Sequence, residues 1–469
     1  MSEGDPGLSG GRIVGSPVSI AEIGGTGLDC AGPIPGYYDS PWPCECGGPR
    51  RQKAPRSRGL HLGSDCTVQQ RTYENGKWNV GTVLRAPGEI YLQSSNHIAD
   101  VEKFGQVERI DPVSLVPLAA SARLPSGGHT WCTALVAHAN GFLYLTNGNR
   151  CFKLDPDDCA VVAETTLPQD APYNSLLVAS DGRLITKNIE YSTVRSSYLV
   201  VLDPDELTQA GPESKLPENA MGRIAMDSIG DEQLVYAPGS RHFHRYRYEP
   251  PQGCLVKDDG WEPLYRLMSD QQQSFAWDPC LAGGGCWFLD NGDNEANQVI
   301  FASHPVGRLV PPRGSAFRGL ATSAQKLIRV SLTDESDVDV LTPFGVARGS
   351  IFSPPAYDPI RGIAIAFDTG NGLLGAAGYN QNERFTPLWQ QPCRTSMQPV
   401  LFLDTAELVV NDFRRGRDNV VIYELESGDE ISRVATDSRT ANGMFFSVGW
   451  DRDVIYCSIG ALARVWAEG

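Results

Sequence analysis

Histidine and carboxylate side chains recur along the chain immediately before or after short apolar segments. His129 follows two glycines, and Asp290, Asp368 and Asp412 each follow an apolar run. An imidazole whose pKa lies near neutrality can both take and return a proton. We therefore predict His129 as a general base, with one of the three aspartates orienting it or serving as the acid.

A second set of polar side chains occupies matching positions and could bind a substrate. Its members are His97, Asn147, Asn174, Asn188, Arg223, Gln398 and His304. Several of these candidates have simpler interpretations. Asn147 precedes Gly148 and is typical of a turn, Asp412 could pair with Arg414 or Arg415, and His97 fits an exposed loop.

Oxygen ligands from several segments could instead hold a divalent cation, calcium or zinc, that acidifies a water molecule. The segment "LDNGDNEAN" is acidic enough for calcium but lacks the twelve-residue spacing of a helix-loop-helix calcium site. His242 and His244 alternate on one predicted strand and form either a metal pair or a solvated edge.

Twelve cysteines are more usual where disulfides form. Cys280 and Cys286 flank "LAGGG" in a predicted hairpin and could be bridged in an oxidising compartment. Zinc is a weaker alternative, because a Cys-x-Cys pair with distant partners is not a usual zinc spacing. The cysteines concerned are Cys30, Cys44, Cys46 and Cys66.

The elements that must position these residues form an internal repeat. The stretch "NGFLYLTNGNRCFKLDPDDCAVVAETTLP" has the order strand, turn, strand, strand, acidic turn, strand, and "SYLVVLDPDELTQAGPESKLP" repeats its second half. Repeats of 40 to 50 residues with four strands each are typical of a β-propeller. We predict an all-β, eight-bladed β-propeller. Its units should begin near residues 84, 131, 174, 222, 273, 350, 397 and 443.

The unit near residue 443 has only three strands before the chain ends. The segment "CTVQQRTYENGKWNVG", residues 66–81, could complete this last blade as its outer strand. The alternative architecture is a stacked pair of two-sheet sandwiches, which explains the incomplete last unit less well.

The turns of the repeat resemble those of the quinoprotein-like, eight-bladed propeller superfamily over residues 66–469. The resemblance is carried by "LDPD" turns and by aspartates expected between first and second strands, namely Asp181, Asp227, Asp278, Asp358, Asp404 and Asp451. The quinone-binding dehydrogenases of that superfamily carry adjacent cysteines and a repeated motif ending in Trp. This chain has no Cys-Cys pair and one related segment, "YENGKW". The resemblance therefore does not imply a quinone cofactor.

Two segments depart from the repeat. Residues 1–65 are rich in Pro, Gly and Cys and are expected to form an arm that is extended around a single propeller domain, residues 66–469, or partly disordered. An insertion at 293–322 interrupts one unit. It could act as a lid that supplies His304, Arg313 or Arg318, or it could pack as decoration.

The formal charge of −16 argues against nucleic acid and anionic membranes as partners, because both require clustered Lys and Arg. A small-molecule substrate fits better. The N-terminus has no leader sequence and no apolar run could span a membrane, so a cytoplasmic protein is expected, or a secreted one if a leader was removed. We predict an enzyme, a lyase, isomerase or hydrolase acting in the central channel. The alternatives are a non-catalytic scaffold that binds a protein or ligand, and a redox protein.

Overall fold

The computed structural model describes residues 28–63, 67–96, 103–129, 132–267, 272–294, 319–351, 354–439 and 445–468. His97, His304 and most of the insertion at 293–322 lie outside the described residues. Only two short 3-10 helices occur in the described part, η2 (Asp29–Ala31) and η3 (Glu45–Gly47). Neither helix is long or apolar enough to cross a membrane.

Six sheets each contain four antiparallel strands that pair in chain order. Three of them are formed by β6 (Cys132–Ala137), β7 (Leu143–Asn147), β8 (Arg150–Leu154) and β9 (Val161–Thr166); by β10 (Tyr173–Val178), β11 (Leu184–Asn188), β12 (Tyr198–Leu202) and β13 (Ser214–Lys215); and by β14 (Ala225–Ile229), β15 (Glu232–Pro238), β16 (Phe243–Glu249) and β17 (Cys254–Asp258). The other three are formed by β18 (Cys280–Ala282), β19 (Gly285–Leu289), β20 (Leu327–Ser331) and β21 (Val338–Leu341); by β22 (Ala356–Asp358), β23 (Ile363–Asp368), β24 (Leu373–Asn380) and β25 (Arg384–Pro392); and by β26 (Val400–Phe402), β27 (Glu407–Arg414), β28 (Arg417–Glu424) and β29 (Glu430–Ala435).

A seventh sheet joins the two ends of the repeat. Its strand order is β30-β31-β32-β1-β2-β3-β4, and β5 also pairs with β3. The strands are β1 (Thr67–Leu84), β2 (Ile90–Ser95), β3 (Phe104–Ile110), β4 (Pro117–Ala120), β5 (Leu124–Pro125), β30 (Phe446–Val448), β31 (Asp453–Cys457) and β32 (Ile459–Glu468).

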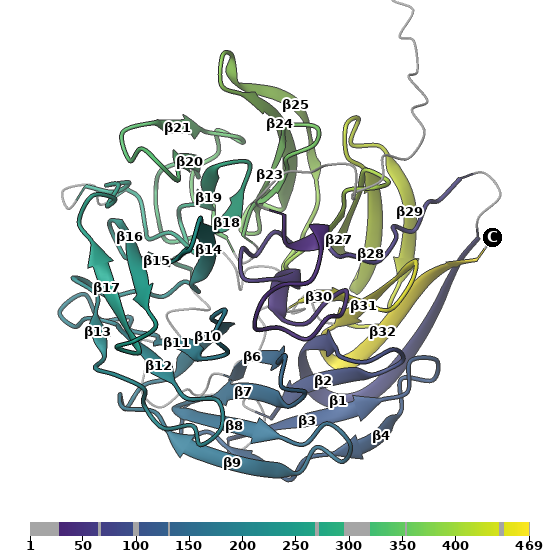
Figure 1. The fold of residues 1–469 in the computed structure, drawn as a ribbon. Coiled ribbons are helices and arrows are strands. Elements are labelled where there is room, and N and C mark those ends of the chain that lie inside the picture. The colour runs from purple at the N-terminus through teal and green to yellow at the C-terminus, as the bar shows by residue number, and fades with distance from the viewer. Residues whose placement is uncertain are drawn as a thin grey trace, which may run out of the picture.

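The sheets are arranged radially, with the first strand of each near the centre and the fourth at the rim (Figure 1). This is a β-propeller, so the prediction of an all-β propeller is confirmed and the sandwich alternative is not. Inner strands are buried on both faces because each sheet packs between two others. All five residues of β7 are buried, whereas most of β9 is exposed. The sequences of inner strands are therefore continuously apolar, and those of outer strands alternate between apolar and polar residues.

The first strands begin close to the predicted unit starts, with the largest offset between residue 273 and Cys280. The start predicted near 84 is too late, because the innermost strand there is the second half of β1. β1 is one strand of 18 residues that pairs with β32 from Thr67 to Glu74 and with β2 from Trp78 to Leu84. Asn75-Gly76 lies between the two halves, where the register with β32 shifts, so this dipeptide forms an irregularity inside a strand.

The aspartates that carry the family resemblance occupy three kinds of position. Asp227 lies within β14 and Asp358 is the last residue of β22. Asp181, Asp404 and Asp451 lie in connections between first and second strands, as expected. Asp278 instead precedes β18, because the connection that follows this strand is Gly283-Gly284, with φ of 56° and 71°. Asp278 is thereby available for a different role inside the channel.

Candidate functional site

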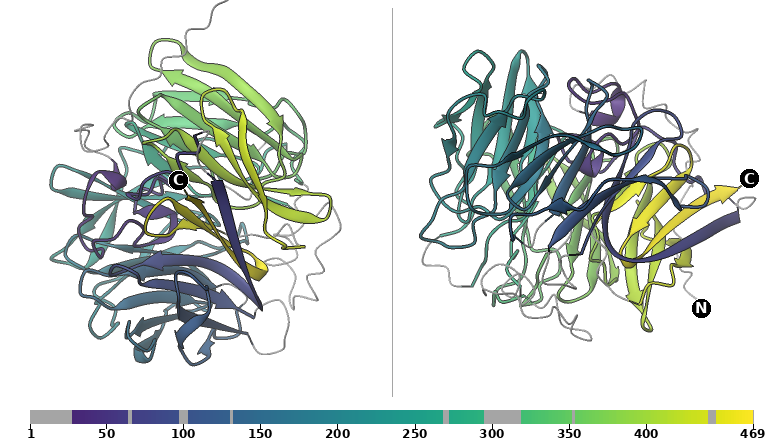
Figure 2. Two further views of the ribbon diagram at one scale, coloured as in Figure 1. Left: turned by 90° about the vertical axis from the view of Figure 1, so that its right-hand side faces the viewer. Right: turned by 90° about the horizontal axis from the view of Figure 1, so that it is seen from below.

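The N-terminal arm, here residues 28–63, lies over the centre of the propeller and enters it from one face (Figures 1 and 2). We call this side the arm face; it carries the connections between first and second strands. Tyr37 forms an isolated bridge with His138, and the Gly59 N–H donates to the Asp404 carboxylate over 3.0 Å. The arm therefore contacts sheets on different sides of the central axis.

Inside the channel, the arm backbone accepts hydrogen bonds from the first strands of several sheets. Met226 of β14 donates to the Pro49 carbonyl, Leu281 of β18 to that of Arg50, and Leu401 of β26 to that of Lys53, each over 2.9 Å. First strands near the axis have one edge without a strand partner. The arm satisfies part of that edge, which would otherwise leave buried N–H groups unpaired.

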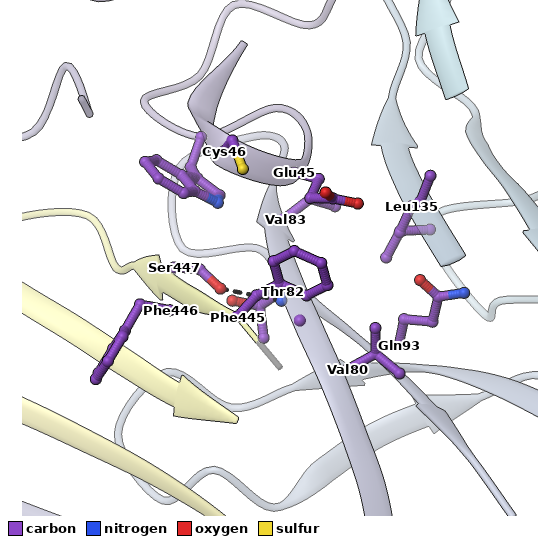
Figure 3. A pocket seen from close by; sticks show the side chains of 13 residues that line it. Glu45, Cys46, Val80, Thr82, Val83, Gln93, Leu135, Phe445, Phe446 and Ser447 are labelled. Carbon is purple, nitrogen blue, oxygen red and sulfur yellow. Dashed lines mark hydrogen bonds between the residues drawn. The ribbon is translucent and has the colours of Figure 1, made fainter. Parts of the chain in front are cut away.

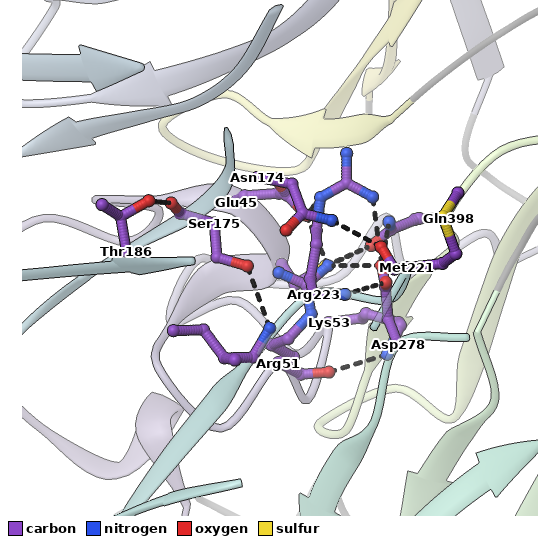
Figure 4. A network of polar contacts seen from close by, with 12 residues as sticks. Glu45, Arg51, Lys53, Asn174, Ser175, Thr186, Met221, Arg223, Asp278 and Gln398 are labelled. Carbon is purple, nitrogen blue, oxygen red and sulfur yellow. Dashed lines mark hydrogen bonds and ion pairs between the residues drawn. The ribbon is translucent and has the colours of Figure 1, made fainter. Parts of the chain in front are cut away.

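A buried cluster of charged side chains surrounds Asp278 where the arm meets the channel wall (Figure 4). The Asp278 carboxylate accepts from the guanidinium of Arg51 over 3.0 Å, from that of Arg223 over 3.2 Å, and from the Gln398 amide over 3.1 Å. The backbone N–H of Arg223 donates to its other oxygen over 2.7 Å. Glu45 of the arm pairs with both Arg51 and Arg223.

The cluster sets the ionisation of its members. Burial alone would raise the pKa of Asp278, but the charges of Arg223 and Arg51 hold that pKa below its ordinary value. Burial lowers the pKa of the nearby Lys187 to about 7. The Lys187 ammonium donates to the carbonyls of Asn188 and Ala220 over 3.0 and 3.1 Å.

Two small cavities lie beside the arm. Figure 3 shows the one lined by Glu45, Thr82 and Gln93, whose volume is about 20 Å³. Buried polar atoms of all three side chains, Glu45 Oε2, Thr82 Oγ1 and Gln93 Nε2, have no hydrogen-bond partner. A second cavity, beside Arg51 and Ser175, measures about 10 Å³. Each is about the size of one water molecule.

Apolar side chains pack next to the charged cluster. Trp78 of β1, Phe275 and Trp277 before β18, and Phe445 before β30 belong to one buried cluster, and the Arg223 guanidinium lies over the Phe445 ring, 4.9 Å from its centroid. At the opposite face, the Tyr191 hydroxyl donates to Asp293 over 2.6 Å, a contact between two sheets. The centre of the propeller therefore combines a charged cluster around Asp278 with an adjoining apolar cluster.

The predicted amides tie loops to strands. Asn147 Nδ2 donates to the Leu124 carbonyl over 2.7 Å, and Asn174 Nδ2 to that of Met221 over the same distance. Asn188 Oδ1 accepts from the backbone N–H of Tyr198 over 2.6 Å. All three are buried and organise the segments that connect neighbouring strands.

The three predicted aspartates are buried and satisfied locally. Asp290 accepts from Gln273 and from the backbone N–H of Lys326, each over 2.6 Å. Asp368 accepts from the backbone and side chain of Asn371, and burial raises its pKa. Asp412 pairs with Arg414 over 2.6 Å and Arg433 over 2.9 Å, so its simpler interpretation fits the geometry.

His129 lies near the opposite face, before β6. Its Nε2 is 3.0 Å from an oxygen of Asp170, whose side chain is 93% exposed. This carboxylate is not among the three predicted to orient the histidine. The role of His129 as a base stays a prediction.

The structure brings together two of the predicted residues, Arg223 and Gln398. Their partners Glu45, Arg51 and Asp278 were not among the predicted site residues. The available signal was the basic run "PRRQK" inside an otherwise Pro- and Gly-rich segment. Such charges next to apolar repeats need carboxylate partners if they are buried.

Ten cysteines are free thiols, of which Cys254 is half-buried and the others are buried, namely Cys30, Cys44, Cys46, Cys151, Cys159, Cys280, Cys286, Cys393 and Cys457. Cys280 and Cys286 lie on opposite faces of one sheet, because they pack in different apolar clusters, so the suggested bridge is not formed. Among the described residues no group of three or more His, Cys, Asp or Glu side chains could hold a metal ion. His244 instead lies between Glu218, at 3.0 Å, and Glu262, at 3.1 Å.

No protein-family model matches the chain, and no curated protein matches it. Solved structures with a similar fold include the quinohemoprotein alcohol dehydrogenase from Comamonas testosteroni, with a TM-score of 0.55, 10% identity, and coverage of 91% of this chain and 80% of that one. A europium-containing methanol dehydrogenase has a TM-score of 0.54, 9% identity, and coverage of 93% and 98%. The Dos1 propeller has a TM-score of 0.53, 9% identity, and coverage of 84% and 94%. At these identities the likeness concerns the fold, and in its fold this chain resembles the quinoprotein-like propellers.

Proposed function

We propose that the chain is a single propeller domain of eight blades, residues 66–469, preceded by an arm, and that β1 closes the ring. The pairing of β1 supports this proposal. Its first half lies beside β32 as a fourth strand, and its second half lies beside β2 as a first strand. Dividing the eight-stranded sheet within β1 yields two four-stranded blades, which join the six separate sheets.

We further propose that the protein is a non-catalytic scaffold that binds a protein or ligand on its outer surface. The observation that carries this proposal is the filling of the central channel by the arm. Propeller ligands commonly use the channel mouth, but here Glu45, Arg51 and Lys53 are inserted between first strands and leave water-sized cavities in the described region. The buried amides and aspartates are already used to fix loops, as a rigid scaffold requires.

The pair of His129 and Asp170 favours a second candidate function. A carboxylate 3.0 Å from an imidazole nitrogen can orient the ring and stabilise its protonated form. The second candidate is therefore an enzyme, a lyase, isomerase or hydrolase, that acts on a small molecule near the opposite face with His129 as the base. Redox chemistry has no comparable support, since burial raises the pKa of thiols such as Cys286 and Cys393 and so disfavours reactive thiolates.

The experiment that tests the scaffold proposal compares binding with turnover. The full chain is cross-linked in extracts of its source, the captured partner is purified, and its affinity is measured by calorimetry. We expect a stoichiometric complex that His129→Ala and Asp170→Asn leave unchanged. The proposal is wrong if no purified partner rebinds while a small-molecule activity is found that falls at least 100-fold in His129→Ala, with unchanged circular dichroism.

A further inference from the structure

A cavity of about 280 Å³ lies between the β18–β21 and β22–β25 sheets, away from the channel. Leu327 and Leu341 line it from one sheet, and β23, β24 and β25 line it from the other. It is far larger than the two cavities beside the arm, which measure about 20 and 10 Å³. Its size is close to the lower end of the range of small-molecule sites, about 300–1,000 Å³.

The cavity results from an unequal distribution of side-chain sizes on the two faces of one sheet. Ile363, Ile365 and Phe367 of β23 pack toward the β26–β29 sheet, in the cluster that contains Leu401 and Leu408. The residues that alternate with them, Ala364 and Ala366, face the cavity. Gly375 and Ala377 of β24 line the same side. The sheet therefore presents small residues where neighbouring blades ordinarily interdigitate.

Polar and aromatic contacts hold the two sheets apart and keep the cavity from collapsing. Arg384 of β25 pairs with Asp337 over 3.0 Å and Asp339 over 2.8 Å, and Tyr379 donates to Asp339 over 2.7 Å. Nearer the axis, the rings of Trp287 and Tyr357 stack with centroids 4.1 Å apart. These contacts fix the spacing on two sides of the gap.

The edge of the cavity carries a β-bulge. Ala376 pairs with Trp389 and Ala377 with Pro387, so Leu388 is an extra residue in β25. Leu388 lines the cavity and is 45% exposed. Bulges are frequent next to binding sites because they redirect a side chain, and this one places an apolar side chain at the entrance.

The lining determines the chemistry of a ligand. The lining contains no charged side chain, and its side-chain hydrogen-bonding groups come from Thr342 and Gln390, because Trp389 Nε1 donates to the Leu425 carbonyl over 2.9 Å. A charged ligand would lose its hydration without compensation. We propose that this cavity binds a small, uncharged, largely apolar molecule of roughly ten to fifteen non-hydrogen atoms. The site is separate from the channel and independent of the scaffold function.

The test uses 1-fluoronaphthalene as the probe and ¹⁹F NMR on the full chain. We expect saturable one-site binding with a Kd on the order of 0.1 mM. Ala366→Leu fills the cavity and should weaken binding at least tenfold. The matched control Ala120→Leu makes the same change on the exposed strand β4 of another sheet and should leave the Kd unchanged.

A second variant keeps the proposal testable if Ala366→Leu fails to fold. Leu388→Asp introduces a carboxylate at the half-exposed entrance and should weaken probe binding at least fivefold while the circular dichroism is unchanged. The anion 1-naphthoate should bind at least tenfold more weakly than the neutral probe. Absence of saturable binding to the wild-type chain below 5 mM overturns the proposal, as does equal affinity in the wild-type chain and a folded Leu388→Asp variant.

Discussion

Asp278→Asn should release the arm from the channel and destabilise the protein. Asp278 is fully buried and is the carboxylate on which Arg51 of the arm and Arg223 of the channel wall converge. The substitution keeps the shape of the side chain but removes its charge, so two buried guanidinium groups are left to share Glu45. Removing one partner of a buried ion pair costs about 3–5 kcal/mol in the free energy of unfolding.

The expected change in Tm follows from the size of the chain. An unfolding entropy of about 2.1 cal/mol/K per residue, applied to a body of roughly 400 residues, converts the loss to a fall in Tm of roughly 4–6 °C. The rate of amide hydrogen exchange should rise more at the contacts of the arm than inside the sheets. The amides of Met226 and Leu281, which donate to arm carbonyls, should exchange hydrogen faster than amides inside β7.

Differential scanning fluorimetry and hydrogen exchange read by mass spectrometry measure the two effects. Asp157→Asn is the matched control, because Asp157 is exposed in a turn at the rim, and its effect should stay within about 0.5 kcal/mol. A Tm within 1 °C of wild type, together with unchanged exchange at Met226 and Leu281, would refute the conclusion that Asp278 holds the arm.

Three further predictions concern titration and thiols. Burial raises the pKa of Asp418 to about 7, above its ordinary value near 3.8; the native state then binds the proton more tightly, so the free energy of unfolding should fall as pH rises from about 4 to about 7. This fall should total up to about 4 kcal/mol, and Asp418→Asn should abolish it when the free energy of unfolding is measured by urea titration at each pH. The same pH dependence in wild type and variant would contradict the assignment. Burial lowers the pKa of Lys187 to about 7 from 10.5, so stability should rise with pH between these values, and Lys187→Met should remove that rise in unfolding curves at pH 7.5 and 9.5. Cys280 and Cys286 should resist a thiol reagent until the protein is unfolded, and non-reducing peptide mapping should find no bridge between them; a cross-linked peptide would disprove their placement on opposite faces.

The propeller could be predicted from the sequence because its determinants are local. Each four-strand unit carries its own turns and apolar runs, as in "FKLDPDDCAVVAETTLP", which becomes β8, an acidic turn and β9. Strands of this kind pair with their sequence neighbours, so reading the repeat also gives the sheet topology. The dual role of β1 was partly predictable from the missing strand of the last unit.

The site was harder to predict because its determinants are distant in sequence. Arg51 and Gln398 are 347 residues apart, and Cys46 and Gln398 are 352 residues apart. No local pattern marks Asp278 as the common partner of Arg51 and Gln398, since an Asp-Pro dipeptide is ordinarily a turn signal. The amides predicted at strand ends, Asn147, Asn174 and Asn188, form hydrogen bonds that fix loops.

The way the arm is held indicates that it docks as one unit. Cys46, Arg51 and Lys53 have φ of 62°, 57° and 63°, a conformation that costs residues other than glycine about 1–2 kcal/mol each. Burying the charges of Arg51 and Lys53 adds a further penalty. The contacts of Arg51 with Glu45, Asp278 and Gln398 and the hydrogen bond from Lys53 Nζ to the Arg51 carbonyl offset it. A partly docked arm would retain the strain and the desolvation without the compensating hydrogen bonds. The arm is therefore expected to be either fully inserted or fully released, so a single substitution at Asp278 should affect all of its contacts together.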